Sequence, residues 1–218
     1  MVQFKNRADR IIKEMTGIEV ERIRSDRTYE EQFYTRRRKG KWEGKIYGWP
    51  IIKGPWCNSY LKVKPLNNAQ KNTIQYIGIA ADEPGRFHNL SDTKKSPLVE
   101  AGWTETMCRE WCEANGLLSP IYTSATRGGC WFCHNQSVQQ LRLLRKEWPE
   151  YWALMLKWDK DSHITFKPDG HTVRDYERRF AEEDAGHIAP GPFRWCDLEN
   201  ELTIGQMNLF EEDNEESP

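Results

Sequence analysis

The segment Ile74-Gln-Tyr-Ile-Gly-Ile-Ala80 decides the fold, because it is the clearest strand pattern in the chain. Its continuous apolar run is typical of a buried strand in a parallel sheet. Asp82-Glu83-Pro-Gly-Arg86 follows at the carboxyl end of this strand. Open α/β sheets place their ligands at that edge. The segment therefore predicts an α/β fold with a parallel sheet and a candidate binding loop directly after the strand.

Helical patterns with recognisable caps surround this strand. Thr28 and Thr104 stand at N-cap positions, with Glu31 as the capping-box partner of Thr28, and Gly17 and Gly116 end helices. The predicted helices are Ala8–Met15, Thr28–Arg38, Asn58–Lys64, Thr104–Asn115, Ser137–Lys146 and Glu150–Lys160.

Three other segments have weaker patterns. Ile18–Ile23 alternates between apolar and polar residues and is predicted as a strand. Gly40–Pro55 is rich in glycine and is predicted as a loop. Beyond Asp161 the patterns weaken, and the last eight or so residues are expected to be disordered.

Composition narrows the classes of function. The 218 residues suffice for one domain, and the net charge of −1 gives the whole molecule no electrostatic attraction to nucleic acid or membrane. We interpret the basic run Arg36–Lys39 and the acidic run Glu211–Glu216 as solvated surface. No apolar stretch reaches the roughly 20 residues of a membrane-spanning helix, and the N-terminus has no signal-peptide pattern. We expect a cytoplasmic protein with reduced thiols.

Cysteines are the strongest chemical signal. Cys130 and Cys133 form a C-x-x-C pair, which presents two thiolates to one metal from a single turn. Cys57 and Cys112 could complete a four-thiolate shell. Cys108 shares a helix face with Cys112, so either could ligate, and we favour Cys112. The alternative is that these are buried structural cysteines.

The identity of the metal is left open between iron–sulfur and zinc, since both accept four thiolates. Trp131 and Phe132 would shield a cluster from water, which slightly favours [4Fe-4S], although core packing explains them equally well.

Several of these segments together resemble the phosphoadenosine phosphosulfate reductase family, in particular its phage and mobile-element branch. The resemblance covers about Ala8 to Trp158. Its motifs are Gly54-Pro-Trp-Cys57 with Leu61-Lys62, Tyr76-Ile-Gly-Ile-Ala-Ala-Asp-Glu83 with Arg86, Pro97-Leu98, Gly116-Leu-Leu-Ser-Pro-Ile-Tyr122 and Arg127-Gly-Gly-Cys-Trp-Phe-Cys-His-Asn-Gln136.

The resemblance implies an adenine-nucleotide α-hydrolase-like parallel sheet with flanking helices, followed by a cysteine-rich helical C-terminal half. It implies a sulfonucleotide reductase-like or sulfur-transfer protein. The catalytic residues would be Lys62, Asp82, Glu83 and Arg86, the substrate-binding residues Lys62, Arg86 and Arg127, and the cluster ligands Cys57, Cys112, Cys130 and Cys133. From the residues alone, an ordinary surface ion pair is the alternative for Asp82, Glu83 and Arg86.

The chain departs from the family in two ways. It has no Ser-Gly-Gly-x-Asp-Ser phosphate loop, whose free N–H groups would bind phosphate at a helix start. ATP or a sulfonucleotide would therefore bind only if a partner polypeptide supplied that loop. The C-terminal Glu-Cys-Gly motif is missing too, with Cys196 its only positional substitute.

Two functional hypotheses follow from these departures. The first is the sulfonucleotide or sulfur-transfer enzyme, or one half of it. The second is a non-catalytic binding module with a structural four-cysteine site, acting with DNA-processing machinery. In either case we expect a partner or self-association to complete the sheet, and we leave direct binding of nucleic acid open.

The predicted organisation is an α/β domain over residues 1–160, an extension over 161–202 and a flexible acidic tail over 203–218. Within the tail, Gln206-Met-Asn-Leu-Phe210 resembles the peptide by which bacterial proteins bind the replication sliding clamp. Leu209 and Phe210 would be its apolar anchors, and Gln206 would add a hydrogen bond. The alternative is a terminal strand or turn whose Leu209 and Phe210 pack on the domain.

Overall fold

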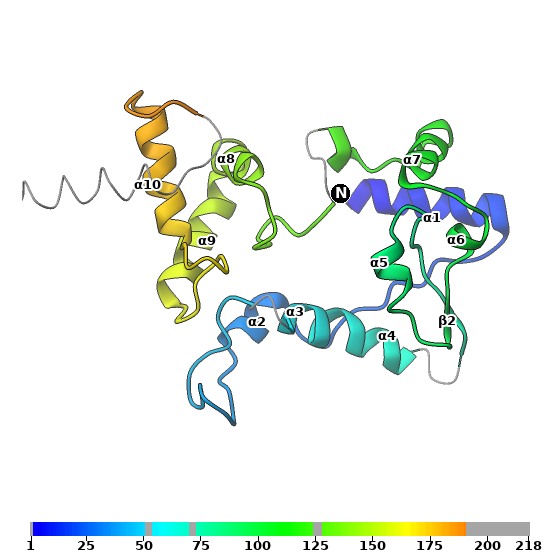
Figure 1. The fold of residues 1–218 in the computed structure, drawn as a ribbon, viewed down its shortest axis with the longest axis horizontal. Helices are drawn as coiled ribbons and strands as arrows, with labels where there is room; N and C mark the ends of the chain where they lie inside the picture. Colours follow the sequence, from blue (N-terminus) through cyan, green and yellow to red (C-terminus); the bar gives the residue numbers. More distant parts are fainter. Residues whose placement is uncertain (1, 51–53, 70–72, 124–127, 191–218) are drawn as a thin grey trace, which may run out of the picture. The chain divides into compact units, whose positions relative to one another are not determined.

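The computed structural model describes residues 2–50, 54–69, 73–123 and 128–190, which divide into two compact units (Figure 1). Unit 1 comprises Met1–Thr35 and Pro50–Cys130, and unit 2 comprises Arg36–Trp49 and Trp131–Pro218. The described fold is mixed α/β and mostly helical, which confirms the fold class at that level. Within the described ranges, no helix is both long enough and apolar enough to cross a membrane.

Unit 1 is assembled from short elements. They are α1 (Val2–Thr16), α2 (Tyr29–Tyr34), α3 (Trp56–Asn58), the π-helical turn η1 (Ser59–Val63), α4 (Lys64–Ala69), β1 (Gln75–Tyr76), α5 (Pro84–Phe87), β2 (Lys94–Lys95), α6 (Pro97–Glu100), α7 (Glu105–Ala114) and the 3-10 turn η2 (Pro120–Thr123). The caps predicted for two of these helices are confirmed. The hydroxyl of Thr28 accepts from the N–H of Glu31, whose carboxylate accepts from the N–H of Thr28 at 2.7 Å. The hydroxyl of Thr104 accepts from the N–H of Met107 at 3.3 Å.

The sheet of unit 1 is shorter than the sequence pattern suggests. β1 and β2 pair in parallel, as predicted, with Gln75 opposite Lys94 and Tyr76 opposite Lys95. The prediction that the strand extends to Ala80 is wrong, because the N–H of Ile79 donates to the carbonyl of Ile77 at 3.0 Å and turns the chain off the ladder. Ile79 is buried, but 69% of Tyr76 is exposed. A sheet of two strands cannot bury both of its faces.

The strand predicted at Ile18–Ile23 is also wrong. In the structure this segment belongs to no helix or strand, and 68% of Ile18 is exposed. Arg22 accounts for the path of the segment, because its guanidinium makes an ion pair with Asp9 and donates to the side chain of Asn6 at 3.0 Å, both on α1. Alternating polarity alone does not make a strand when no described neighbour pairs with it.

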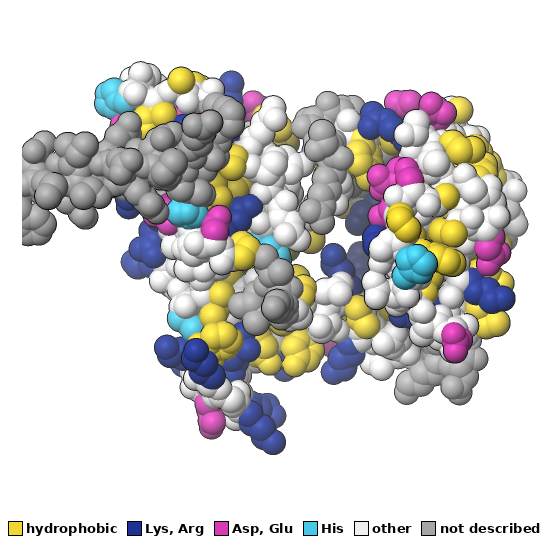
Figure 2. Space-filling model, in the orientation of Figure 1, with side chains coloured by type: hydrophobic (Ala, Val, Ile, Leu, Met, Phe, Trp, Pro, Cys, Tyr) yellow, Lys and Arg dark blue, Asp and Glu magenta, His cyan; other side chains and the backbone are white. Residues whose placement is uncertain are grey.

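Unit 2 begins with a hairpin where a helix was predicted. The helix predicted to reach Arg38 instead ends at Tyr34, and Arg36 pairs with Ile46 in an antiparallel bridge. The predicted loop Gly40–Pro55 therefore contains the second arm of a hairpin. Gly40 and Gly44 have φ values of +91° and +77°, which glycine adopts readily and which let the chain turn back. We call residues 36–47 the basic hairpin; Figure 2 shows Lys and Arg side chains gathered over it, at the lower end of the view.

The remaining elements of unit 2 are helices: α8 (Val138–Glu147), α9 (Pro149–Asp161) and α10 (Val173–Asp184). The first two were predicted, and Ser137 caps α8 through a capping box with Gln140. The third, α10, was missed. Its signal was present in the sequence, because Thr172 and Asp175 form a capping box, and Val173, Tyr176 and Phe180 follow at helical spacing and are buried.

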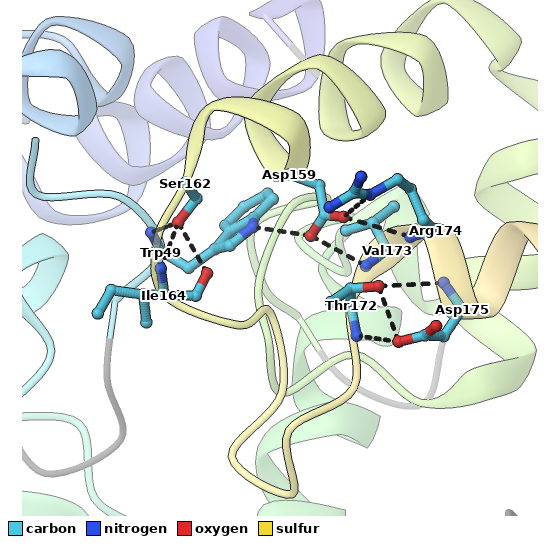
Figure 3. Close-up of polar contacts among 8 residues, drawn as sticks. All are labelled: Trp49, Asp159, Ser162, Ile164, Thr172, Val173, Arg174 and Asp175. Atoms are coloured by element: carbon cyan, nitrogen blue, oxygen red, sulfur yellow. Dashed lines mark hydrogen bonds and ion pairs between the residues drawn. The ribbon is translucent and has the colours of Figure 1, made fainter.

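A buried carboxylate joins three segments of unit 2 (Figure 3). Asp159 on α9 accepts hydrogen bonds from the indole N–H of Trp49 at 3.2 Å and from the backbone N–H of Val173 at 3.0 Å. The guanidinium of Arg174 donates to its second oxygen at 3.1 Å. The Asp159 side chain is 1% exposed. A carboxylate at this depth is tolerable because hydrogen-bond donors occupy its oxygens.

We predict that Asp159→Ala destabilises unit 2 by about 2–4 kcal/mol, because it leaves the indole of Trp49 and the N–H of Val173 buried without an acceptor. Urea denaturation followed by tryptophan fluorescence measures this loss. Glu150→Ala, an exposed carboxylate on the same helix, is the matched control and should change stability by less than about 0.5 kcal/mol. Equal losses in the two variants would show that Asp159 is not the joining group.

Candidate functional site

The loop after β1 contains three of the residues predicted to act on an anion. Arg86 donates from one Nη to both carboxylate oxygens of Glu83, at 2.6 and 2.9 Å. The backbone N–H of Ala80 donates to Glu83 at 3.2 Å. The Asp82 carboxylate accepts from the backbone N–H of Glu105, at the start of α7, at 3.0 Å. All three side chains therefore take part in contacts within unit 1.

These contacts reduce the charge that the loop offers to a ligand. The hydrogen bond from Arg86, and then that from the N–H of Ala80, hold the pKa of Glu83 below its ordinary value. Glu83 is therefore ionised at neutral pH and neutralises Arg86, whose side chain is 61% exposed. An incoming sulfate or phosphate would compete with the Glu83 carboxylate for the Arg86 guanidinium.

The other two predicted anion-binding residues are Lys62 and Arg127. Lys62 is exposed on η1. Arg127 lies outside the described residues. The geometry thus brings together Asp82, Glu83 and Arg86, and leaves Lys62 and Arg127 as predictions.

Three of the four predicted metal ligands belong to unit 1: Cys57 on α3, Cys112 on α7 and Cys130, each partly exposed. Across the described ranges, no three or more His, Cys, Asp or Glu side chains lie close enough to hold one metal ion. The unit 1 cysteines therefore do not fit a preformed centre. If they bind metal, their segments must move together as it binds, which couples metal binding to folding.

The two cysteines of α7, Cys108 and Cys112, are four residues apart on this helix. Burial raises the pKa of the Cys108 thiol, and the nearby Cys112, Asp82 and Glu105 raise it further. The choice of Cys112 over Cys108 as the metal ligand stays a prediction.

The second cysteine of the C-x-x-C pair, Cys133, lies in unit 2 in a turn closed by a hydrogen bond from the Gln136 N–H to its carbonyl, at 2.9 Å. The ammonium of Lys167 donates to the carbonyls of His134 and Gln136 at 2.6 and 2.7 Å. Burial lowers the pKa of Lys167, while Asp169 and Cys133 act in the opposite direction. Lys167 therefore holds the backbone of this turn in place.

Lys167 was not found from the sequence. Its partners are main-chain carbonyls more than thirty residues away, and side-chain motifs do not encode such contacts. The sequence did indicate one feature of this turn, because core packing was one of the two interpretations given for Trp131 and Phe132.

Those aromatics pack within unit 2. The ring of Trp131 stacks on Tyr151 and on Trp158, with centroids 4.8 and 5.7 Å apart, and Phe132 meets Trp158 edge-on. Of the two roles considered for Trp131 and Phe132, core packing is the one that the described contacts support.

Three sequence predictions fall outside the described residues. Cys196, the acidic tail, and the docking residues Gln206, Leu209 and Phe210 all lie beyond residue 190. The sliding-clamp peptide and the expected disorder of the tail therefore stay predictions.

Comparison with known proteins adds no relative. No family model matches this chain, and neither the curated proteins nor the solved structures gave a match. The resemblance to the phosphoadenosine phosphosulfate reductase family therefore rests on the motifs alone.

We predict that anaerobically purified chain contains iron with sulfide, or zinc, and that Cys112→Ser removes it while Cys108→Ser does not. A structural thiolate site supplies about 10 kcal/mol or more, so loss of metal should also lower stability by several kcal/mol. Elemental analysis, the visible spectrum and thermal denaturation check this. Cys130→Ser and Cys133→Ser should behave like Cys112→Ser. A metal-free native chain, or equal metal in the two α7 variants, would contradict the predicted ligand set.

Proposed function

We propose that this chain is a non-catalytic binding module whose unit 1 is completed by a partner polypeptide or by a second copy. The main support for the proposal is that the charged side chains in the loop after β1 already have partners within unit 1. Asp82 caps α7, and Glu83 neutralises Arg86, so the charged side chains that a catalytic anion site would need are engaged by the fold itself. DNA-processing machinery in the cytoplasm is the class of partner that we favour.

Exposed apolar side chains in unit 1 support completion by a partner. The sheet contains only β1 and β2 among the described residues. Tyr76 on β1 is 69% exposed and Ile74 beside it 57%. Further exposed apolar residues of this unit include Val63, Leu66, Phe87, Met107 and Trp111. Open strand edges next to apolar surface are templates for pairing with another chain.

We expect the purified chain to self-associate with rising concentration or to bind a polypeptide that pairs with β1. Tyr76→Lys should weaken either form of association at least tenfold, because it puts a charge at the strand edge. Ile18→Lys, an equally exposed apolar position outside the sheet, is the matched control and should have little effect. Light scattering across a dilution series measures self-association. A native chain that stays monomeric and does not bind a dye specific for apolar surfaces would refute the proposal.

A sulfonucleotide or sulfur-transfer function is the second candidate. The parallel pairing of β1 with β2 and the position of Arg86 on α5, in the segment that follows β1, favour it, because parallel sheets bind ligands at their carboxyl edge. The adenine-nucleotide α-hydrolase-like fold belongs to this candidate. It requires a partner polypeptide that supplies the phosphate loop, and Arg86 and Lys62 would then bind the sulfate or phosphate oxygens.

Calorimetric titration of sulfate into two variants, Arg86→Ala and Glu83→Gln, distinguishes the two candidate functions. For a binding module, we expect native chain and Arg86→Ala to bind sulfate equally weakly. Glu83→Gln, which releases the Arg86 guanidinium, should bind sulfate up to about tenfold more tightly, the worth of one charge-assisted hydrogen bond. If Arg86→Ala instead loses tenfold or more from a measurable native affinity, the second candidate is correct.

A further inference from the structure

The basic hairpin concentrates positive charge that the chain as a whole does not have. Residues 36–47 include six basic side chains, Arg36, Arg37, Arg38, Lys39, Lys41 and Lys45, and one carboxylate, Glu43. The full chain has a net charge of −1, so this segment is a local exception. Binding through it would be a property of one surface and not of the total charge.

Hydrogen bonds make the segment a two-stranded ribbon with a tight tip. The N–H of Arg37 donates to the carbonyl of Lys45 at 2.8 Å, and the N–H of Gly44 donates to the carbonyl of Arg37 at 2.9 Å. At the tip, the N–H of Glu43 donates to the carbonyl of Gly40 at 3.0 Å. The basic side chains are thus held on a defined element.

Two of the arginines build the hairpin. Arg36 donates to the carbonyl of Gly44 at 2.6 Å. Arg37 donates to the carbonyl of Tyr47 at 3.2 Å, and its guanidinium lies 5.1 Å from the ring centroid of Trp42 and 4.4 Å from that of Tyr47. These contacts fix the ribbon and its aromatic residues.

Of the other four cations, Lys41 is exposed and its ammonium lies 5.7 Å from the ring centroid of Trp42, and the remaining three face solvent. Arg38, Lys39 and Lys45 are exposed, and none of them makes an ion pair with a residue that the structure describes. Glu43 likewise has no ion pair among those residues. In the helices of unit 2, by contrast, several arginines pair with carboxylates, as Arg142 and Arg179 do with Glu183. The hairpin cations are therefore available to an external anion.

The tip of the hairpin packs against His163 of unit 2. Trp42 meets the His163 ring edge-on, with centroids 5.8 Å apart. Both ring nitrogens of His163 are buried without a hydrogen-bond partner. Burial lowers the pKa of His163, and the nearby Lys45 and Arg37 lower it further, so the imidazole is neutral and the positive charge stays on the hairpin.

We propose that the basic hairpin binds the phosphate backbone of a nucleic acid, independently of sequence. A two-stranded ribbon fits the major groove of duplex DNA, which is about 12 Å wide, and Lys and Arg side chains on it reach phosphates on either side. The main aromatic ring of the hairpin, Trp42, is held by Arg37 and His163, so no apolar anchor is offered to a membrane. This inference stands on unit 2 alone and goes beyond the proposed function.

The test is fluorescence anisotropy of a short labelled DNA duplex titrated with the full chain between about 50 and 200 mM salt. We expect affinity in the range of about 10⁻⁴–10⁻⁶ M, falling steeply with salt. The variant Arg38→Gln with Lys39→Gln and Lys45→Gln should lose at least tenfold in affinity. The slope of log K against log salt should become shallower by about 2 to 3, one unit per lost phosphate contact.

A matched control removes three exposed cations elsewhere in unit 2: Lys146→Gln with Lys160→Gln and Arg178→Gln. It changes the net charge equally and should keep the native affinity and slope. Glu43→Lys is a gain-of-function variant that should tighten binding several-fold, and it keeps the test decisive if the triple hairpin variant folds poorly. Circular dichroism monitors folding throughout.

Three outcomes would overturn the proposal. The first is an equal loss of affinity in the hairpin and control variants. The second is DNA binding that Glu43→Lys does not tighten. The third is binding of native chain to phosphatidylserine vesicles, but not to DNA, that the hairpin variant abolishes, which would assign the hairpin to membranes.

Discussion

Unit 2 depends on the four hydrogen bonds that the buried Asp159 carboxylate accepts. One donor comes from Trp49, at the end of the segment that carries the basic hairpin, and the others come from the start of α10. Trp49 is fully buried and packs edge-on against Phe166, with ring centroids 4.9 Å apart. Removing the carboxylate would thus release the hairpin segment and α10 together.

Some basic side chains of this protein form ion pairs within the fold, whereas others do not. In unit 1, Glu83 and Arg86 satisfy each other after β1. In the helices of unit 2, Arg145 pairs with Glu177 and Asp184 in the same way. On the hairpin, Arg38, Lys39 and Lys45 have no such carboxylate among the described residues. Whether an arginine is a candidate ligand residue therefore depends on its neighbours and not on its sequence motif.

Local patterns predicted the helices well, because their determinants are close in sequence. The capping box of Thr28 with Glu31 and the N-cap at Thr104 were predicted from neighbouring residues, and both were correct. Contacts between distant residues were not visible. The strand pattern at Ile74–Ala80 gave no indication that a neighbour pairs over only two residues, and the helix pattern after Thr28 did not reveal the bridge from Arg36 to Ile46.

For the candidate site too, the sequence predicted relations between neighbouring residues and not contacts between distant ones. The sequence placed Asp82, Glu83 and Arg86 together because they are close in the chain. In the structure Glu83 accepts from Arg86, whereas Asp82 accepts from the N–H of Glu105. The sequence did not show that Asp82 would cap α7, or that Lys167 would hold the turn after Cys133, since both depend on tertiary packing. A four-thiolate centre drawn from separated segments is the kind of long-range feature that a single sequence constrains least.

The discontinuity of unit 2 has a consequence for synthesis on the ribosome. Trp49 and its acceptor Asp159 are 110 residues apart, and the part of the chain between them includes most of unit 1. At about 5–20 residues per second, the Trp49 segment emerges several seconds, up to about 20 s, before Asp159 exists to receive it. During that interval an apolar indole and a cationic ribbon are both uncovered. A nascent chain of this kind offers a binding site for a chaperone, and for any polyanion nearby, before its own core can form.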